Sequence, residues 1–401
     1  MIKVGLIREG KVPIDKRVPL TPEQASYAKQ KFNVDVVAQS SAIRCFSDDD
    51  YRLAGIDVVE DISDCDILLG VKEVPINELI ENKTYFFFSH TTKKQPYNRT
   101  LLQSVVKKNI RLIDYEGLTN SKGHRVVAFG RYAGIVGAYN GILTYGKRYN
   151  LFELKSAHKC HDLAELKTEL SKVKLPAIKI VLTGGGRVAR GAMEILDLAG
   201  IKRVSSKEIL EEQFPQAVYA QLNMDDYNLT LGGQPFTHDE FHQAPEHFKG
   251  DFLKYTKVAD FLIAGAFWDP KSPVLFTKQD AQNKDFAIKV IADITCDIEG
   301  SIPSTLRAST IDDPIYDYST LEGIEKPALS NENNITVMAV DNLPCELPRD
   351  ASNSFGDQLI TNVLPHLFAA DNDGVIKRAT ICENGKLTEK YSYLQDYLEG
   401  R

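Results

Sequence analysis

The sequence predicts an α/β protein with two domains, each built around a parallel sheet. Apolar, β-branched stretches alternate with helix-like stretches over most of the 401 residues, which is the pattern of parallel sheets covered by helices. Three of the strand-like stretches end in runs that carry titratable side chains. The carboxyl ends of parallel strands share one edge, where open α/β sheets bind ligands. We therefore expect four side chains to converge there: Lys72, Glu73, His90 and Glu116.

The first domain is expected to begin with a strand at 2–7. Thr21 and Gln24 form a capping box around Pro22 at the first helical position, so a helix begins there and runs to about Lys31. The elements expected after it are a strand at 34–38, a short helix from Ser47, strands near 56–59, 66–71 and 84–88, a helix over 97–107, and a strand at 111–115.

A stretch rich in small residues, 133–141, predicts a helix with one close-packing face. We interpret this face as a helix–helix contact, with direct ligand contact as the alternative. A Lys-rich helix and linker over 155–174 then leads to the second domain. The elements expected there are a strand at 178–183, an irregular excursion over 223–257, strands at 259–265 and 286–294, and a last strand at 334–341, followed by a helix at 351–367 and a polar tail.

The domain boundaries follow from this order. Residues 1–133 and 342–401 are expected to form one discontinuous domain, since the helix and tail that follow the last strand would pack back on the first half. Residues 134–341 are expected to form the second domain. Catalysis would take place in a cleft between the two domains, and closure of one on the other would exclude water.

Composition excludes several classes of protein. A hydrophobic content of 43% and a charged content of 26% are typical of a soluble globular protein, and the net charge of −7 argues against a nucleic-acid partner. No apolar run approaches the ~20 residues that span a membrane, and the N-terminus has no signal-peptide pattern. The six cysteines are scattered without a C-x-x-C pair, which favours reduced thiols in a cytoplasmic enzyme. The residues at 158–161 suit no common zinc spacing, so no metal is expected.

A glycine-rich loop follows the strand at 178–183 and opens a helix. It satisfies the pattern G-x-G-x-x-G/A, in which the glycines permit a tight turn and a close approach of backbone to a pyrophosphate. The N-terminus of the following helix supplies N–H donors to the phosphates. We therefore predict a dinucleotide in a Rossmann-like domain, held by Gly184, Gly186, Arg187, Val188 and Ala189.

The choice of cofactor depends on the strand end about 20 residues beyond the first glycine. An acid there accepts hydrogen bonds from the ribose of NAD. The stretch 202–208 instead offers hydroxyls and cations, with Ser205 at the expected strand end, which favours NADP(H) over NAD(H). Glu208 lies close enough to reverse this preference if the strand ends later.

Motifs spread over the chain resemble those of one family. Arg17 to Pro22 reads R-x-x-L-T-P, which is similar to a signature of the alanine dehydrogenase and transhydrogenase N-terminal domain. Other motifs resemble the L-lysine-forming saccharopine dehydrogenase branch, and within it the lysine–2-oxoglutarate reductase domain of aminoadipate semialdehyde synthases. These motifs are Val71–Pro75, Phe88–Asn98, Arg125–Gly130, Ala292–Ile294 with Gly300–Ile302, Val340–Pro344, and Asn384–Leu387 with Lys390 and Tyr391.

The resemblance implies an enzyme that interconverts L-lysine plus 2-oxoglutarate with saccharopine, using a nicotinamide cofactor. One departure is Arg131, at a position where relatives carry an uncharged residue. The site residues that the resemblance implies are Lys72 and His90 as the acid/base pair, Arg17 for a substrate carboxylate, Glu73 and Glu116 beside the pair, and Asp341 near the nicotinamide.

The implied reaction of an amine with a ketone needs side chains of these types. An amine must lose a proton before it attacks a ketone, and the departing hydroxyl must gain one, so a Lys and a His tuned near neutrality could serve. The two carboxylates of 2-oxoglutarate suit arginine, for which Arg17 and Arg125 are candidates. Two alternatives remain: another amino-acid dehydrogenase of the superfamily, similar to alanine dehydrogenase, and a nucleotide-sensing regulator without catalysis.

Overall fold

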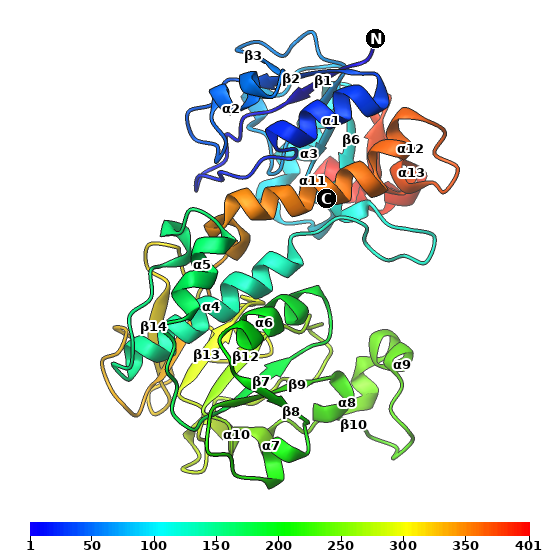
Figure 1. The fold of residues 1–401 in the computed structure, drawn as a ribbon. Helices are drawn as coiled ribbons and strands as arrows, with labels where there is room; N and C mark the ends of the chain where they lie inside the picture. Colours follow the sequence, from blue (N-terminus) through cyan, green and yellow to red (C-terminus); the bar gives the residue numbers. More distant parts are fainter. The chain divides into compact units, whose positions relative to one another are not determined.

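A computed structural model describes residues 1–401, and the chain divides into two compact units (Figure 1). Unit 1 comprises Met1–Phe129 and Pro348–Arg401, and unit 2 comprises Gly130–Leu347. The divisions lie at 129/130 and 347/348, where the sequence led us to expect 133/134 and 341/342. The first turn of α4 (Gly130–Arg148) belongs to unit 2 because this helix packs along α6 (Arg187–Leu198). The expected cleft between the two units stays a prediction.

Unit 1 contains an eight-stranded, mostly parallel sheet in the order β18-β17-β6-β5-β4-β1-β2-β3. Its strands are β1 (Lys3–Leu6), β2 (Asp35–Gln39), β3 (Asp57–Val59), β4 (Ile67–Leu69), β5 (Thr84–Phe87), β6 (Arg111–Asp114), β17 (Thr380–Glu383) and β18 (Lys386–Leu387). Its helices are α1 (Pro22–Phe32), α2 (Asp48–Leu53), α3 (Arg99–Lys107), α11 (Pro348–Asn362), α12 (Leu364–Phe368), α13 (Val375–Ala379) and α14 (Gln395–Glu399).

Alternation along the strands of unit 1 produces an apolar cluster on each face of the sheet. In β4, Ile67 and Leu69 join the cluster that contains Phe355 of α11, whereas Leu68 joins the cluster that contains Leu102 of α3. Successive strand residues point to opposite faces, so a strand buried on both faces is apolar throughout. The predicted capping box at Thr21 is present.

The strand at 335–338 is not the last strand of the chain, as the sequence led us to expect. The polar tail adds β17 and β18 to unit 1, where β17 pairs antiparallel with β6. The short stretch Thr380–Glu383 is buried at its first three residues, and it lies next to β6. Pairing with β6 therefore stabilises a segment whose own sequence gives a weak strand signal.

Unit 2 contains a second eight-stranded sheet in the order β15-β14-β16-β13-β12-β7-β9-β8, and a separate hairpin of β10 and β11. Its strands are β7 (Lys179–Thr183), β8 (Lys202–Val204), β9 (Val218–Leu222), β10 (Asn228–Thr230), β11 (Phe248–Gly250), β12 (Phe261–Ala264), β13 (Val290–Asp293), β14 (Ile315–Ser319), β15 (Ile324–Lys326) and β16 (Ile335–Met338). Besides α4 and α6, its helices are α5 (Leu163–Leu170), α7 (Glu208–Glu211), α8 (Met224–Tyr227), α9 (His238–Gln243) and α10 (Leu253–Thr256).

These two mostly parallel sheets confirm the predicted α/β class. The prediction of the cofactor assumed that the strand following the glycine-rich loop and its helix is the direct neighbour of β7. In unit 2 that neighbour is β9, which was not recognised as a strand in the sequence. β9 pairs with β7 along its whole length, and β8 pairs only with the outer side of β9. Lys202 and Arg203 of β8 are exposed, whereas β9 is almost entirely buried, so the more apolar strand occupies the inner position.

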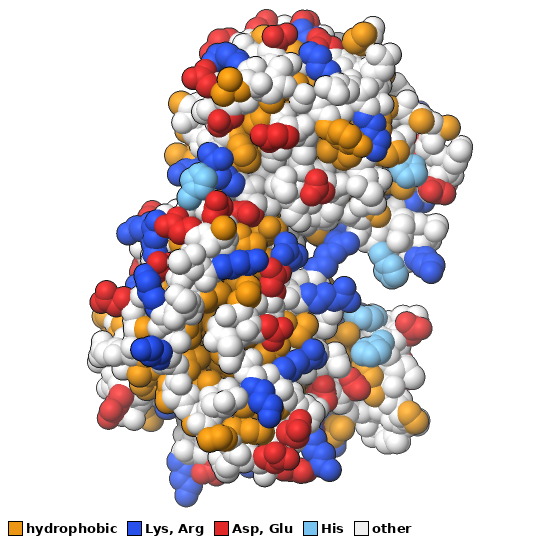
Figure 2. Space-filling view, viewed as in Figure 1, with side chains coloured by type: hydrophobic (Ala, Val, Ile, Leu, Met, Phe, Trp, Pro, Cys, Tyr) orange, Lys and Arg blue, Asp and Glu red, His pale blue; other side chains and the backbone are white.

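The face of each unit in Figure 2 shows no extended area of one charge. Figure 2 shows acidic, basic and apolar side chains interspersed over the face that it draws of each unit. None of the helices is both long and apolar enough to cross a bilayer.

The small residues of α4 make its contact with α6 unusually close, and Figure 1 shows the two helices side by side on the sheet of unit 2. A Cβ atom at Gly134 would lie 1.9 Å from the carbonyl oxygen of Val188, and one at Gly191 would lie 2.0 Å from that of Arg131. Gly141 instead faces the sheet, where a Cβ would lie 2.6 Å from the ring of Phe261. The contact at Gly134 confirms the predicted helix–helix packing, and the contact at Gly141 shows that the same stretch also packs on the sheet.

Gly134→Ala is expected to destabilise unit 2 by about 2–3 kcal/mol, because a methyl group there overlaps a backbone carbonyl that cannot rotate away. Gly130→Ala on the same helix is the matched control. Its Cβ would lie 3.3 Å from the side chain of Arg187 and its effect should stay within about 1 kcal/mol. Urea unfolding measures both variants, and equal stability of the two would contradict the close contact.

Candidate functional site

Two of the four side chains expected at the carboxyl edge of the sheet in unit 1, Glu73 and His90, contact each other there. β4 and β5 are neighbouring parallel strands that end at the same level, with Leu69 opposite Phe86. The chain beyond β4 carries Glu73, and the chain beyond β5 carries His90. Nδ1 of His90 lies 2.6 Å from Oε1 of Glu73, and both side chains are largely buried. The structure thus joins two of the four residues directly.

Glu73 is the charged partner of this pair. Burial alone would raise its pKa, but hydrogen bonds from His90 and from Lys11 outweigh burial and lower the pKa to about 2. Its second oxygen accepts from Nζ of Lys11. Glu73 is therefore a carboxylate at neutral pH, and it fixes the orientation of the imidazole ring that it contacts. Lys11 was not among the residues expected from the sequence.

Lys72 projects from the same loop, and its backbone is held by a residue that sequence reasoning passed over. The carboxylate of Glu9 accepts hydrogen bonds from the backbone N–H groups of Val71 at 2.7 Å and Lys72 at 2.9 Å. Glu9 follows β1, the parallel neighbour of β4. The rule that selected His90 and Glu116, a titratable residue just beyond a strand end, would have selected Glu9 too.

Glu116 lies at the end of the next strand, β6, among cations. Its Oε1 is 3.7 Å from Nη2 of Arg125 and 3.9 Å from Nζ of Lys93. Asp114, fully buried, anchors the local chain by accepting from the backbone N–H groups of Ser89 at 3.0 Å and Glu116 at 2.7 Å. The structure therefore places Glu116 and Arg125 together.

Arg17 is buried, only 2% exposed, and forms a bidentate ion pair with Asp15. Nε lies 3.0 Å from one carboxylate oxygen, and Nη2 lies 2.6 Å from the other. Its guanidinium also stacks over the ring of Phe129 at 4.2 Å. A substrate carboxylate would therefore meet an arginine that is already oriented by Asp15, and this role of Arg17 remains a prediction.

A small cavity of about 220 Å³ opens beside Glu73. Its wall is mostly apolar, and Lys11, Glu73 and Asn98 are its polar lining residues. The apolar wall is formed by Val74, Pro75, Ile76, Tyr97 and Leu101. Such a cavity suits an aliphatic chain that ends in a charged group.

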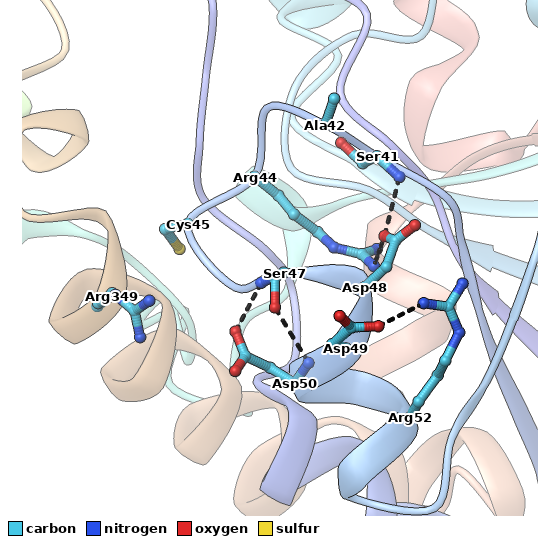
Figure 3. Close-up of a pocket in the computed structure, with 10 residues that line it drawn as sticks. All are labelled: Ser41, Ala42, Arg44, Cys45, Ser47, Asp48, Asp49, Asp50, Arg52 and Arg349. Carbon is cyan, nitrogen blue, oxygen red and sulfur yellow. Dashed lines mark hydrogen bonds and ion pairs between the residues drawn. The ribbon is translucent and has the colours of Figure 1, made fainter.

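Another cavity of unit 1, of about 540 Å³, lies where α2 begins (Figure 3). Most of its charged side chains pair with one another: Arg44 contacts Asp48, and Arg52 contacts Asp49. Ser47 and Asp50 form the capping box of α2. These contacts explain the charges as local structure, so we assign this cavity no ligand.

The glycine-rich loop of unit 2 has the geometry that a pyrophosphate needs. Gly184 has φ of +99°, and a Cβ there would lie 3.0 Å from the α-carbon of Ala266, so only glycine fits. Gly186 is the N-cap of α6, and a Cβ there would meet nothing within 4 Å. Arg187 and Val188 begin α6, and Ala189 is buried against the sheet. Open space in front of a helix N-terminus fits the phosphates of a dinucleotide.

A cavity of about 510 Å³ lies at the ends of β8 and β9, where the cofactor's ribose was expected. Gln221 of β9 links this cavity to the loop, since its Nε2 donates to the carbonyl oxygen of Gly184 at 2.9 Å and its Oε1 accepts from Arg203 at 2.9 Å. Ser205 also lines the cavity, and its backbone N–H donates to Glu208 at 2.7 Å. Sequence reasoning missed Gln221 because it missed β9.

The remaining expected residues lie elsewhere in unit 2. Asp341 is exposed and follows β16, with its backbone N–H on the carbonyl oxygen of Ser309 at 3.2 Å. Arg131 forms a bidentate ion pair with Glu194 of α6, at 2.7 to 3.1 Å, which accounts for the extra cation. No group of three or more His, Cys, Asp or Glu side chains is arranged to hold a metal ion, and all six cysteines are free.

Comparison with known proteins shows which proteins this chain is similar to. Residues 5–136 match the family model described as alanine dehydrogenase/PNT, N-terminal domain. The chain is 30% identical to the mitochondrial alpha-aminoadipic semialdehyde synthase of Rattus norvegicus over an alignment 449 positions long, gaps included. This alignment covers 99% of this chain and 48% of that protein. The chain is 26% identical to saccharopine dehydrogenase [NAD(+), L-lysine-forming] of Yarrowia lipolytica, covering 90% and 92%.

The chain spans about half the length of the synthases it matches. Among solved structures, an L-alanine dehydrogenase aligns with a TM-score of 0.63 at 15% identity, over 100% of this chain and 99% of that one, which shows a shared fold. Together these findings confirm the predicted family: the chain carries an alanine dehydrogenase/PNT N-terminal domain, and its homologues are the alpha-aminoadipic semialdehyde synthases and the saccharopine dehydrogenases.

Proposed function

We propose that this protein is an oxidoreductase that interconverts L-lysine plus 2-oxoglutarate with saccharopine, using a nicotinamide cofactor. The observation that carries the proposal is the His90–Glu73 pair beside Lys72, at the carboxyl edge of one sheet, in a chain whose second sheet presents a dinucleotide loop. The names of the relatives, L-lysine-forming saccharopine dehydrogenase and aminoadipic semialdehyde synthase, support the choice of substrates. The six free cysteines accord with a cytoplasmic enzyme, which remains a prediction.

In this proposal, Lys72 and His90 move the protons. Nδ1 of His90 is engaged by the Glu73 carboxylate, so Nε2 is the ring nitrogen left to exchange a proton with the substrate. One group removes a proton from the attacking lysine amine, and the other protonates the hydroxyl that leaves as water. The nicotinamide, when bound, supplies the hydride that reduces the resulting imine.

The remaining residues would bind the substrates. Arg17, oriented by Asp15, and Arg125, beside Glu116, would each hold a carboxylate of 2-oxoglutarate. The apolar cavity next to Glu73 offers a surface for the four-carbon stem of lysine. Asp341, at the carboxyl end of β16, would lie near the nicotinamide.

The choice of amine tests the proposal. With 2-oxoglutarate and reduced cofactor, L-lysine is expected to support oxidation of the cofactor, because the apolar wall beside Glu73 suits its stem, whereas ammonia is not. Absorbance at 340 nm, with saccharopine identified by mass spectrometry, measures the reaction. Turnover with ammonia in place of lysine would indicate an enzyme similar to alanine dehydrogenase. Cofactor binding without turnover of any amine would indicate a regulator.

Loss of either acid/base group should reduce turnover strongly. Lys72→Met and His90→Gln are each expected to lower kcat by roughly 10²–10⁴, the usual effect of removing a general acid or base. Lys122→Met and His124→Gln are matched controls, since both side chains are exposed in the same unit and form no hydrogen bond or ion pair with Lys72, Glu73 or His90. Steady-state rates at saturating substrates decide, and a near-normal rate would remove that residue from the mechanism.

We also propose NADP(H) as the preferred cofactor. Arg203 and Ser205 line the cavity at the ends of β8 and β9, where a 2′-phosphate would be held. Asp225 and Asp226 line the same cavity and would suit the free ribose of NAD(H). The measured preference between NADPH and NADH therefore shows which of these two sets of side chains contacts the ribose.

NADPH is expected to show a much lower KM than NADH. Ser205→Asp should shift the preference toward NADH, because a carboxylate repels a phosphate dianion and accepts from a ribose hydroxyl. Arg203→Ala should raise KM for NADPH and leave KM for NADH nearly unchanged. Initial rates with each cofactor measure both. An equal or lower KM for NADH in the unsubstituted chain would show that an acidic side chain binds the ribose hydroxyls instead.

A further inference from the structure

Glu9 is a buried carboxylate to which the proposed reaction gives no part. It is 8% exposed and lies three residues beyond the end of β1. Both of its oxygens accept hydrogen bonds, one from the backbone N–H of Val71 and the other from that of Lys72. A side chain that uses both oxygens on consecutive backbone N–H groups fixes the path of that backbone.

The sheet explains why this contact is needed. β1 and β4 run parallel with Leu6 opposite Leu69, and the last backbone bond between them joins the N–H of Ile7 to the carbonyl oxygen of Leu69. On its other side, β4 continues further, since the carbonyl oxygen of Val71 accepts from Phe88. The N–H groups of Val71 and Lys72 therefore lie beyond the last pairing with β1, and the Glu9 carboxylate takes the place of the missing strand.

The segment is also held from a second side. The carbonyl oxygen of Gly70 accepts from the hydroxyl of Tyr115 at 2.9 Å. A Cβ at Gly70 would lie 3.5 Å from Oε1 of Glu9, so the carboxylate packs closely against this residue. Glu9 and Tyr115 thus fix the backbone of Gly70, Val71 and Lys72.

We propose that Glu9 is a positioning residue for Lys72: it fixes the backbone from which this side chain reaches the substrate. The inference rests on the proposed function only for the catalytic role of Lys72. Glu9 itself touches no substrate. Because a displacement of about 1 Å can slow a reaction by ~10²-fold, holding this backbone matters for the rate.

The charges around Glu9 give this role a pH dependence. Burial, and then the neighbouring Asp15 carboxylate, raise the pKa of Glu9 to about 8, although the two N–H donors and Arg17 act against them. The hydroxyl of Tyr115 is a further ionisable group that interacts with it, whereas Lys72 contacts it through its backbone N–H. As pH rises through about 8 the group becomes charged, and hydrogen bonds to a charged acceptor are stronger.

The raised pKa of Glu9 also makes the stability of the fold depend on pH. A carboxyl group with a raised folded-state pKa stabilises the fold fully below its unfolded value of about 4.3 and loses this contribution as pH rises toward 8. The stability of Glu9→Gln relative to the unsubstituted chain should therefore improve between pH 5 and pH 9. Urea midpoints at the two pH values measure this trend.

Glu9→Gln keeps the volume but turns an N–H₂ group toward one of the two backbone donors. We expect kcat to fall 10- to 100-fold with KM for 2-oxoglutarate within about 3-fold. The pH profile of kcat/KM should change mainly above about pH 8, where Glu9 of the unsubstituted chain carries a charge that Gln lacks. Glu60→Gln is the matched control, because Glu60 is exposed and pairs only with Arg8.

Hydrogen exchange gives a readout that does not depend on activity. In Glu9→Gln, the peptide containing Val71 and Lys72 should exchange its amide hydrogens at least about 5-fold faster, while peptides from unit 2 remain unchanged. Unchanged exchange, or a kcat within about 2-fold of the unsubstituted value, would overturn the positioning role. Absence of lysine turnover in the unsubstituted chain would show that the proposed function fails, and this inference with it.

Discussion

The candidate site depends on one constraint: β1, β4, β5 and β6 are adjacent parallel strands that end at the same level. A hydrogen bond between His90 and Glu73 spans 17 residues of sequence, yet it needs no long loop because the two strand ends lie side by side. Glu9 meets the backbone of Lys72 for the same reason across the β1–β4 pair. The parallel sheet thus turns distant sequence positions into neighbours at one edge.

That edge must hold charges in a largely buried setting, and each buried charge is matched by several donors or by an opposite charge. Asp15 pairs with Arg17, Glu73 accepts from His90 and Lys11, and Asp114 accepts from the chain around Ser89. An unmatched buried charge would cost several kcal/mol. The consequence is that the polar groups of the candidate site are held in place by one another, an arrangement that would favour a rapid reaction in the proposed enzyme.

Sequence patterns correctly predicted the features that depend only on residues close together in the chain. The capping box at Thr21, the helix from Ser47 and the glycine loop before α6 depend on residues within a few positions of one another, and the structure has all three. Sequence also predicted that Glu73 and His90 meet, since that follows from strand order. It did not predict the contacts of Arg17, because the burial of Asp15 and the stacking on Phe129 arise from tertiary packing.

Missing a strand has a consequence that extends to the cofactor. β9 and β17 are two of the strands that were not recognised in the sequence, and a strand that is missed changes the neighbours of those around it. Counting residues from Gly184 leads to Ser205 at the end of β8, whereas the strand adjacent to the loop is β9, with Gln221 bonded to Gly184. A spacing rule for ribose recognition assumes that the second strand in sequence is also the second in space. In this sheet it is not, so the residues that distinguish the cofactors must be sought at the ends of both β8 and β9.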